Sequence, residues 1–195
     1  RAVNNVLLYG ESGTGKSATV KSLLALPGFE NLRLIEVQKE ELADLPDLIR
    51  ALAGRKPKFI LFIDDLAFDQ DDRTYSALKT ILEGGLEKRP ANVAIYATSN
   101  RRHLVRQTFS DRAGDEVDAF ETIQEKTSLA ERFGLRIPYL ALSKAEYLDM
   151  VEAMAARAGI AMDREELRAE AVKWEMHHPG RTPRIVRQFI ASLAM

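Results

Sequence analysis

The sequence contains no cysteine. This absence excludes a disulfide framework, a thiolate metal site and a thiol nucleophile, and it favours a reducing, cytoplasmic setting. The chain also has no run that approaches the roughly 18 consecutive apolar residues of a membrane span. Its N-terminus lacks the basic and then apolar layout of a signal peptide. We therefore expect a cytoplasmic protein without membrane contact.

The chain also lacks an excess of positive or negative charge, because its 195 residues carry a formal net charge of −1. Nucleic acid could therefore be bound only through a local patch. The cluster Arg101, Arg102, His103 and Arg106 could form one, but it lacks interleaved aromatic residues and fits contact with a neighbouring subunit better. The first residue is Arg1 rather than Met, so we expect a piece of a longer protein.

Short runs rich in apolar and β-branched residues predict five strands, with helical patterns between them. Most of the runs are continuously apolar, as expected for a parallel sheet covered on both faces. Strands that alternate with helices indicate an α/β doubly wound core. The predicted strands are residues 5–9, 32–37, 59–63, 93–98 and 137–142, and the predicted helices between them are 16–26, 40–54 and 73–85, the last closed by Gly84 and Gly85.

After residue 142 the pattern is helical alone. Ser143 with Glu146 has the spacing of a capping box, and so has Asp163 with Glu166. Thr182 before Pro183 is typical of an N-cap followed by a first-turn proline. We therefore predict an α/β core over residues 1–142 and a small three-helix lid over residues 143–195, with helices at about 144–158, 164–177 and 183–194.

The run GESGTGKS fits the pattern G-x-x-x-x-G-K-[ST] between a predicted strand and a predicted helix, which is the context of a phosphate-binding P-loop. Its glycines let the backbone take positive φ and turn N–H groups toward a phosphate. Lys16 lies where the helix dipole repels a cation, so its position makes sense with a triphosphate bound. Ser17 would give its hydroxyl to Mg²⁺. The alternative is a plain glycine-rich turn. The predicted phosphate-binding set is Gly10, Glu11, Ser12, Gly13, Thr14, Gly15, Lys16 and Ser17.

Two adjacent carboxylates, Asp64 and Asp65, follow the buried run FILFI. Isolated charges beside apolar neighbours are costly unless a cation or hydrogen bonds compensate them. Successive strand side chains point to opposite sides of a sheet, so the two carboxylates are predicted to have different roles. Asp64 would hold Mg²⁺ through water, and Asp65 would face the water that attacks the γ-phosphate. The alternative is that both merely cap the next turn.

The order of these motifs resembles that of the additional-strand branch of P-loop proteins, which implies the strand order 5-1-4-3-2. One strand-helix unit, residues 32–53, lies between the phosphate loop and the acidic strand, and a later strand ends in Thr98, Ser99 and Asn100. A polar residue at that strand end can reach the γ-phosphate. Asn100 is predicted to do so, with Thr98 and Ser99 as its neighbours.

Together, these residues resemble AAA+ ATPases over essentially the whole chain. Walker A is matched by GESGTGKS, Walker B by FILFIDD, sensor 1 by ATSN, the arginine-finger box by SLAERFG and sensor 2 by GRTPRIVRQF. More narrowly, the chain resembles an uncharacterised bacterial family of AAA+ ATP-binding proteins, through LEGGLEKRPANVAIYATSNRRHL and EKTSLAERFGL. The resemblance implies ATP and Mg²⁺ as cofactors and a homo-oligomer with sites between subunits.

The resemblance also gives roles to two arginines. Arg132 would be the finger that reaches the neighbouring subunit's γ-phosphate, although an arginine just before Gly134 also suits a helix C-terminus. Arg184 would be the sensor 2 arginine on the bound phosphates, at a first helical turn where the dipole disfavours a cation. Asp65 departs from the family, which usually has Glu there, so either the attacking water is held slightly differently or hydrolysis is slow.

The sequence thus predicts a Mg²⁺-dependent ATPase that forms ADP and phosphate and remodels an unknown partner. The predicted catalytic residues are Lys16, Asp65, Asn100, Arg132 and Arg184, and the predicted metal ligands are Ser17 and Asp64. The alternative is an ATP-regulated binding module with little turnover. A small-molecule kinase would not need sensor 2, and a GTPase would need the [NT]-K-x-D motif, which the sequence lacks.

Overall fold

The structure is a computed structural model that describes residues 4–67, 73–83, 90–100, 129–178 and 180–194. The chain divides into two compact units. The first unit comprises Arg1–Gly10 and Lys16–Pro138, and the second comprises Glu11–Gly15 and Tyr139–Met195. Within the described ranges, no helix is long and apolar enough to cross a membrane.

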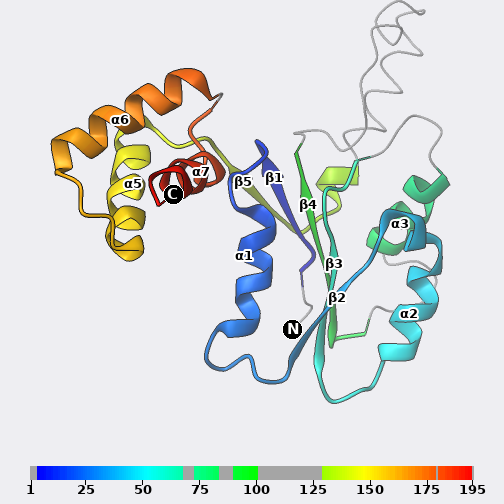
Figure 1. Cartoon of the computed structure of the whole chain (residues 1–195). Helices are drawn as coiled ribbons and strands as arrows, with labels where there is room; N and C mark the ends of the chain where they lie inside the picture. Colours follow the sequence, from blue (N-terminus) through cyan, green and yellow to red (C-terminus); the bar gives the residue numbers. More distant parts are fainter. Residues whose placement is uncertain (1–3, 68–72, 84–89, 101–128, 179, 195) are drawn as a thin grey trace, which may run out of the picture. The chain divides into compact units, whose positions relative to one another are not determined.

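The first unit is built on a five-stranded sheet with the order β2-β3-β4-β1-β5 (Figure 1). This is the predicted order 5-1-4-3-2 read from the opposite edge, so the predicted topology is confirmed. The pairs β1–β4, β3–β4 and β2–β3 are parallel, so the carboxyl ends of β1, β3 and β4 share one edge of the sheet. The strands are β1 Val6–Gly10, β2 Leu32–Glu36, β3 Lys58–Ile63, β4 Val93–Ser99 and β5 Leu135–Tyr139.

The helices of the first unit are partly shorter than predicted. They include α1 Lys16–Ser22, α2 Leu45–Leu52 and α3 Arg73–Glu83, with 3-10 helices η1 Leu23–Ala25 and η2 Lys39–Asp44. The second predicted helix is divided because Pro46 lies in the first turn of α2. A proline has no N–H and its ring clashes with the preceding turn, so an α-helix begins at it. The predicted closure of α3 by Gly84 and Gly85 lies outside the described residues.

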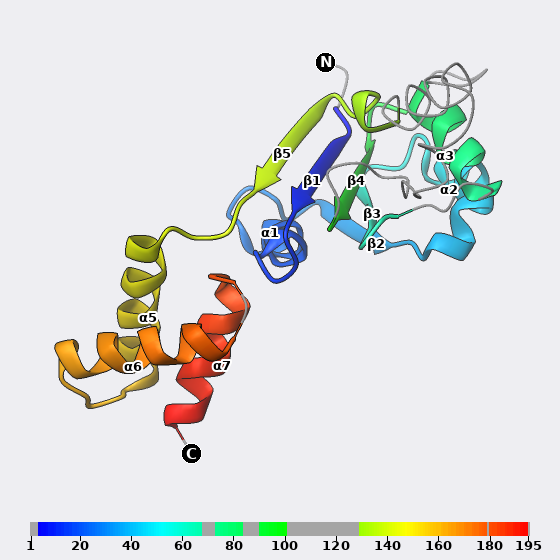
Figure 2. The ribbon, with the colours of Figure 1, turned by 90° about the horizontal axis from the view of Figure 1, so that it is seen from above.

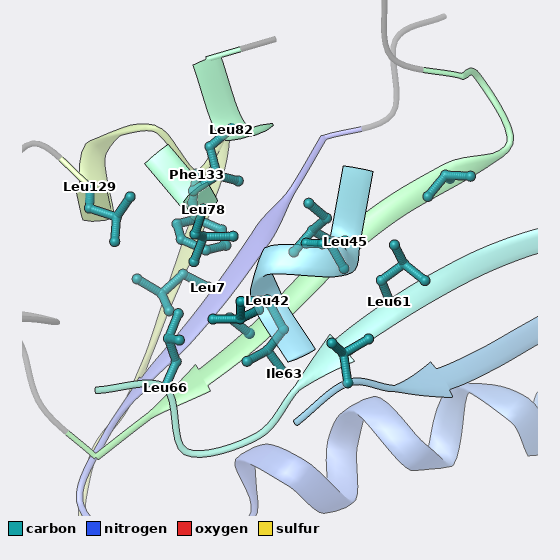
Figure 3. Close-up of a cluster of buried hydrophobic side chains, with 14 of the residues drawn as sticks. Leu7, Leu42, Leu45, Leu61, Ile63, Leu66, Leu78, Leu82, Leu129 and Phe133 are labelled. Carbon is teal, nitrogen blue, oxygen red and sulfur yellow. The ribbon is translucent and has the colours of Figure 1, made fainter. Parts of the chain in front are cut away.

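Helices cover both faces of the sheet, with α1 on one side and α2 and α3 on the other (Figures 1 and 2). The side chains of β3 divide accordingly. Phe59, Leu61 and Ile63 belong to the large apolar cluster that includes leucines of η2, α2 and α3 (Figure 3). Phe62 instead faces α1, where Lys21 Nζ lies 5.8 Å from its ring centroid. Burial on both faces explains why the strands read as continuous apolar runs.

Strand β5 begins and ends earlier than the predicted strand 137–142. The N–H of Leu135 donates to the carbonyl of Asn5 at 3.1 Å, which fixes the start of β5 beside the residue that precedes β1. The N–H of Leu142 instead donates to Arg181 O, at 2.8 Å, within the second unit. Because β5 is an exposed edge strand, it tolerates Pro138.

The second unit contains helices α5 Lys144–Ala158, α6 Arg164–His177 and α7 Pro183–Leu193, close to the predicted ranges. They enclose a core of their own around Tyr147, Val151 and Phe189. Tyr147 is fully buried, which raises the pKa of its hydroxyl, and this hydroxyl donates to Ala171 O at 3.1 Å. Ser143 and Glu146 form the predicted capping box, whereas Asp163 accepts from the N–H of Glu165 at the start of α6.

Replacing Glu146 by glutamine should lower the melting temperature at neutral pH and have no effect in acid. The hydrogen bond with the Ser143 side chain lowers the pKa of Glu146 in the folded state, and the bond with the Ser143 backbone lowers it further by a smaller amount. The resulting stabilisation is complete above the unfolded pKa and disappears as the pH falls through the lowered folded pKa. Thermal unfolding followed by circular dichroism at pH 7 and in acid checks this.

The matched control is Glu166→Gln, at the same helical position of α6, where Asp163 bonds to Glu165 instead. This control should leave the melting temperature nearly unchanged. A stability difference for Glu146→Gln that stays constant from neutral to acid pH would contradict the assignment.

Candidate functional site

The predicted phosphate loop connects β1 to α1, and its residues Glu11–Gly15 group with the second unit. Gly13 and Gly15 have φ angles of 79° and 102°, in the left-handed region that favours glycine. The hydroxyl of Thr14 donates to Glu11 O at 2.8 Å, which closes this turn. Left-handed residues that alternate in this way with a residue of negative φ turn backbone N–H groups to one side, as an anion site requires.

Lys16 is held at the carboxyl end of the sheet although its side chain carries a charge. It is only 6% exposed. Its Nζ donates to Gly10 O at 2.9 Å and to Asn100 Oδ1 at 2.8 Å. These contacts fix the ammonium group between the end of β1 and the residue that follows β4, in the first unit.

Asp64 and Asp65 lie in the turn after β3, because the strand ends at Ile63. The alternation of strand side chains, from which two separate roles were predicted, therefore does not apply to this pair. The turn itself separates them, since Asp65 has a φ of 53°. Aspartate is one of the few residues besides glycine that tolerate this conformation.

The two carboxylates consequently have different partners. Asp64 Oδ1 accepts from Ser17 Oγ at 2.6 Å. Asp65 Oδ1 accepts from Asn100 Nδ2, also at 2.6 Å. Asp64 therefore contacts α1 through Ser17, whereas Asp65 contacts the residue that follows β4.

Asn100 joins Lys16 to Asp65 in one hydrogen-bonded chain. Its Oδ1 accepts from the lysine and its Nδ2 donates to the aspartate. This orientation of the amide is fixed chemically, because an ammonium group can only donate and an ionised carboxylate can only accept. The chain places a cation, an amide and a carboxylate side by side at the edge where the γ-phosphate was predicted to lie.

The residues Ser17 and Asp64 fit Mg²⁺, which prefers oxygen ligands and retains several waters. Their oxygens lie 2.6 Å apart, on α1 and on the turn after β3. Over the described ranges, no three His, Cys, Asp or Glu side chains gather into a metal site. Mg²⁺ is usually held by one or two protein groups together with substrate phosphates.

Arg184 lies against the phosphate loop within the second unit. Its NH1 donates to Ser12 Oγ at 3.3 Å, and its backbone N–H donates to Gly13 O at 3.3 Å. A side chain at Gly13 would meet Arg184 Cβ at 2.9 Å and Thr182 Oγ1 at 3.1 Å. Glycine is therefore required at position 13 both by its positive φ and by the close approach of α7.

Arg132 is the predicted site residue that is bonded elsewhere in the first unit. Its Nε donates to Glu83 Oε1 at 2.7 Å, and its NH2 lies 2.6 Å from the same oxygen. The arginine side chain is 23% exposed and that of Glu83 is 46% exposed. Glu83 is the last residue of α3, and Arg132 lies in the turn that follows the short helical segment 129–131, so the pair links these two segments.

The structure thus brings Lys16, Ser17, Asp64, Asp65 and Asn100 together in the first unit. Sequence reasoning gave no role to Thr98 or Glu83. The only signal for Thr98 was a hydroxyl at the end of a buried strand. For Glu83 there was none, because its partner Arg132 is remote in sequence. The basic residues at 101, 102, 103 and 106 lie outside the described residues.

Comparison with known proteins gives a family and a fold. A family model described as "Protein of unknown function (DUF815)" matches residues 1–195. No curated protein sequence matches the chain. A variant of RuvB from Thermotoga maritima has a similar structure, with a TM-score of 0.60 at 14% identity over 98% of this chain and 54% of that chain.

Two further structures are similar. The T. maritima RuvB Holliday junction branch migration motor gives a TM-score of 0.52 at 15% identity, over 98% of this chain and 54% of that one. Hsp104 in a closed state with ATPγS and casein gives 0.57 at 14% identity, over 98% of this chain and 40% of that one. The chain therefore spans about half the length of the RuvB structures. At these identities the likeness shows the fold, which is that of the AAA+ P-loop proteins.

Proposed function

The chain belongs to the DUF815 family, and from this membership, its AAA+ fold and the geometry of its site we propose that it binds Mg-ATP and hydrolyses it to ADP and phosphate. The observation that carries the proposal is the hydrogen-bonded chain from Lys16 through Asn100 to Asp65. It joins a phosphate-binding cation to a carboxylate that can act on water. The contact of Ser17 with Asp64 beside it supplies oxygens for a metal.

Binding would rest on the loop and on Lys16. The backbone N–H groups of Gly10–Ser17 would surround the β-phosphate, and the lysine would pair with the β- and γ-phosphates. Mg²⁺, held by Ser17 and through water by Asp64, would neutralise the charge that develops on the phosphate oxygens. In exchange for the phosphates, Lys16 would give up part of its bonding to Gly10 and Asn100.

Hydrolysis would rest on Asp65 and Asn100. The carboxylate of Asp65 would accept a hydrogen bond from the attacking water and orient it toward the γ-phosphate. The amide of Asn100, already bonded to Lys16 and Asp65, would hold the water and a γ-phosphate oxygen in line. Positioning and charge stabilisation account for most of the catalysis of phosphoryl transfer.

Two arginines would complete the charge stabilisation. Arg184 would contact the phosphates, and its bond to Ser12 of the phosphate loop supports this role. Arg132 would serve the site of a neighbouring copy, so we propose a homo-oligomer. Its bond to Glu83 would then have to be exchanged for the neighbour's γ-phosphate. As both partners are partly exposed, such an exchange costs little.

Lys16→Ala should weaken the binding of Mg-ATP about 30-fold or more, because losing a buried charge-assisted contact costs about 2–5 kcal/mol. A fluorescent ATP analogue titrated against the full-length protein measures this. The matched control is Lys21→Ala on the same helix, whose half-exposed side chain pairs with Glu36 at 3.3 Å and should not affect binding. If Lys16→Ala binds like the wild type while folding normally, the proposed site is wrong.

The work that hydrolysis performs is proposed only as the remodelling of a partner. An Asp65→Asn variant that binds ATP without hydrolysing it would stay bound to its partner. Affinity capture of this variant would then recover DNA if the partner is DNA, or one particular protein if the partner is a protein. The second candidate function is an ATP-regulated binding module with little turnover. This function is favoured by Asp65, whose side chain is one methylene shorter than the glutamate usual at this position. Tight ATP binding without phosphate release would support it further.

A further inference from the structure

One buried threonine contacts both aspartates of the site. Thr98, near the end of β4, is 1% exposed. Its Oγ1 donates to Asp64 Oδ1 at 2.5 Å and accepts from the N–H of Asp65 at 2.9 Å. A hydroxyl has one proton and two lone pairs, so one side chain can make both bonds at once.

The backbone of Thr98 extends the same attachment by one residue. Its carbonyl accepts from the N–H of Leu66 at 2.7 Å. Three consecutive residues after β3 are therefore bonded to a single residue of the neighbouring strand. Thr98 is also stiff about χ1, because it is β-branched and packed inside the sheet. It can therefore hold the turn in which Asp65 has its left-handed φ of 53°.

The direction of the Asp64 carboxylate is set from two sides. Its Oδ1 accepts from Thr98 and, at 2.6 Å, from Ser17 on α1. Thr98 belongs to the sheet, so its bond is independent of α1 and of the phosphate loop. The hydroxyl of Ser17 can then bind a metal while Thr98 keeps the carboxylate in place.

We propose that Thr98 is the positioning residue of this site, which aims Asp64 at the Mg²⁺ position and holds the Asp65 turn so that its carboxylate meets Asn100. The inference rests on the proposed function. Side-chain partners one step removed from a metal commonly tune its affinity, and their loss costs about 10- to 100-fold. If Thr98 merely accepted a hydrogen bond from a buried N–H, its replacement would change the stability of the protein but not its response to Mg²⁺.

The test compares Thr98→Val, which removes the hydroxyl at nearly constant shape, with Thr98→Ser, which keeps the hydroxyl. The affinity of a fluorescent ATP analogue is measured over a range of Mg²⁺ concentrations, with turnover and urea unfolding measured on the same samples. We expect Thr98→Val to raise the Mg²⁺ concentration for half-maximal binding about 10- to 100-fold and to lower kcat by a similar factor. Thr98→Ser should stay close to the wild type.

The matched control is Thr80→Val on α3, which removes a hydroxyl bonded only to Ser76 O among the contacts described for it, at 3.0 Å. A folded Thr98→Val protein with the wild-type Mg²⁺ response would overturn the inference, and so would a Thr98→Ser protein as impaired as Thr98→Val. If Thr98→Val does not fold, Thr98→Cys takes its place, since a thiol is a weak donor and should shift the Mg²⁺ response in the same direction.

The two proposals fail separately. A wild-type protein that binds nucleotide with Mg²⁺ but releases no phosphate would refute hydrolysis. The Mg²⁺ titration would still decide the role of Thr98 in that case. A wild-type protein that hydrolyses Mg-ATP, together with a folded Thr98→Val protein that keeps the wild-type Mg²⁺ response, would refute the role of Thr98 alone.

Discussion

Replacing Asp65 by asparagine is expected to lower the rate of ATP hydrolysis about 10²- to 10⁴-fold and to leave the affinity for Mg-ATP almost unchanged. The replacement has the same shape, and its amide oxygen can still accept from Asn100 Nδ2, as the carboxylate does at 2.6 Å. The variant loses the ionised carboxylate, which orients the attacking water by accepting a hydrogen bond from it. Phosphate release and nucleotide binding, measured on the same preparation, check both halves of this expectation.

The matched control for this variant is Asp47→Asn. Asp47 lies on α2 in the same unit, its side chain is 72% exposed, and it pairs with Arg50 one turn away. The same chemical change there should leave turnover and binding alone. If Asp65→Asn hydrolyses ATP as fast as the wild type, Asp65 does not act on the water, and the mechanism needs another base.

Replacing Arg132 by alanine is expected to reduce hydrolysis in the assembled protein about 10³-fold or more, because an arginine finger contributes about 10³ to 10⁵ to the rate. Stability should change little, since the lost ion pair with Glu83 is partly exposed and such pairs contribute about 0–1 kcal/mol. Nucleotide binding to a single chain should also persist. The matched control is Arg136→Ala on β5, an exposed arginine four residues further along.

A mixing experiment shows whether Arg132 acts on a neighbouring copy. Chains with Arg132→Ala keep a complete site but lack the finger, and chains with Asp65→Asn keep the finger but lack the carboxylate. Mixed oligomers would contain some sites with both groups, so part of the turnover should return. No recovery on mixing, despite assembly, would mean that Arg132 acts within its own chain or has only a structural role with Glu83.

A parallel sheet was predictable from local patterns, whereas the strand order was predicted from the resemblance to the additional-strand branch of P-loop proteins. The continuous apolar runs indicated a parallel sheet, and the observed order β2-β3-β4-β1-β5 is the predicted one. The lid helices were predicted closely because Ser143 and Thr182 cap them with their own side chains. The fifth strand was misplaced by two to three residues, because its start is fixed by a bond to Asn5, which is remote in sequence.

The site was predictable where one short motif supplies the chemistry, as in the loop that ends in Lys16 and Ser17. It was not predictable where strands from different parts of the chain meet. The separation of Asp64 from Asp65 results from a turn with φ of 53° at Asp65, not from strand alternation. Aspartate tolerates this backbone well, which gives position 65 a structural reason to depart from the usual glutamate. The bonds of Thr98 and the pairing of Arg132 with Glu83 are tertiary contacts that no spacing rule indicates.

The most direct test of the proposed mechanism is the steady-state release of phosphate from Mg-ATP by the full-length protein, measured over a range of protein concentrations. We expect turnover whose rate per chain rises with protein concentration, because assembly would bring Arg132 of one copy to the site of the next. Tight Mg-ATP binding with no phosphate release at any concentration would contradict it and would leave the ATP-regulated binding module as the function.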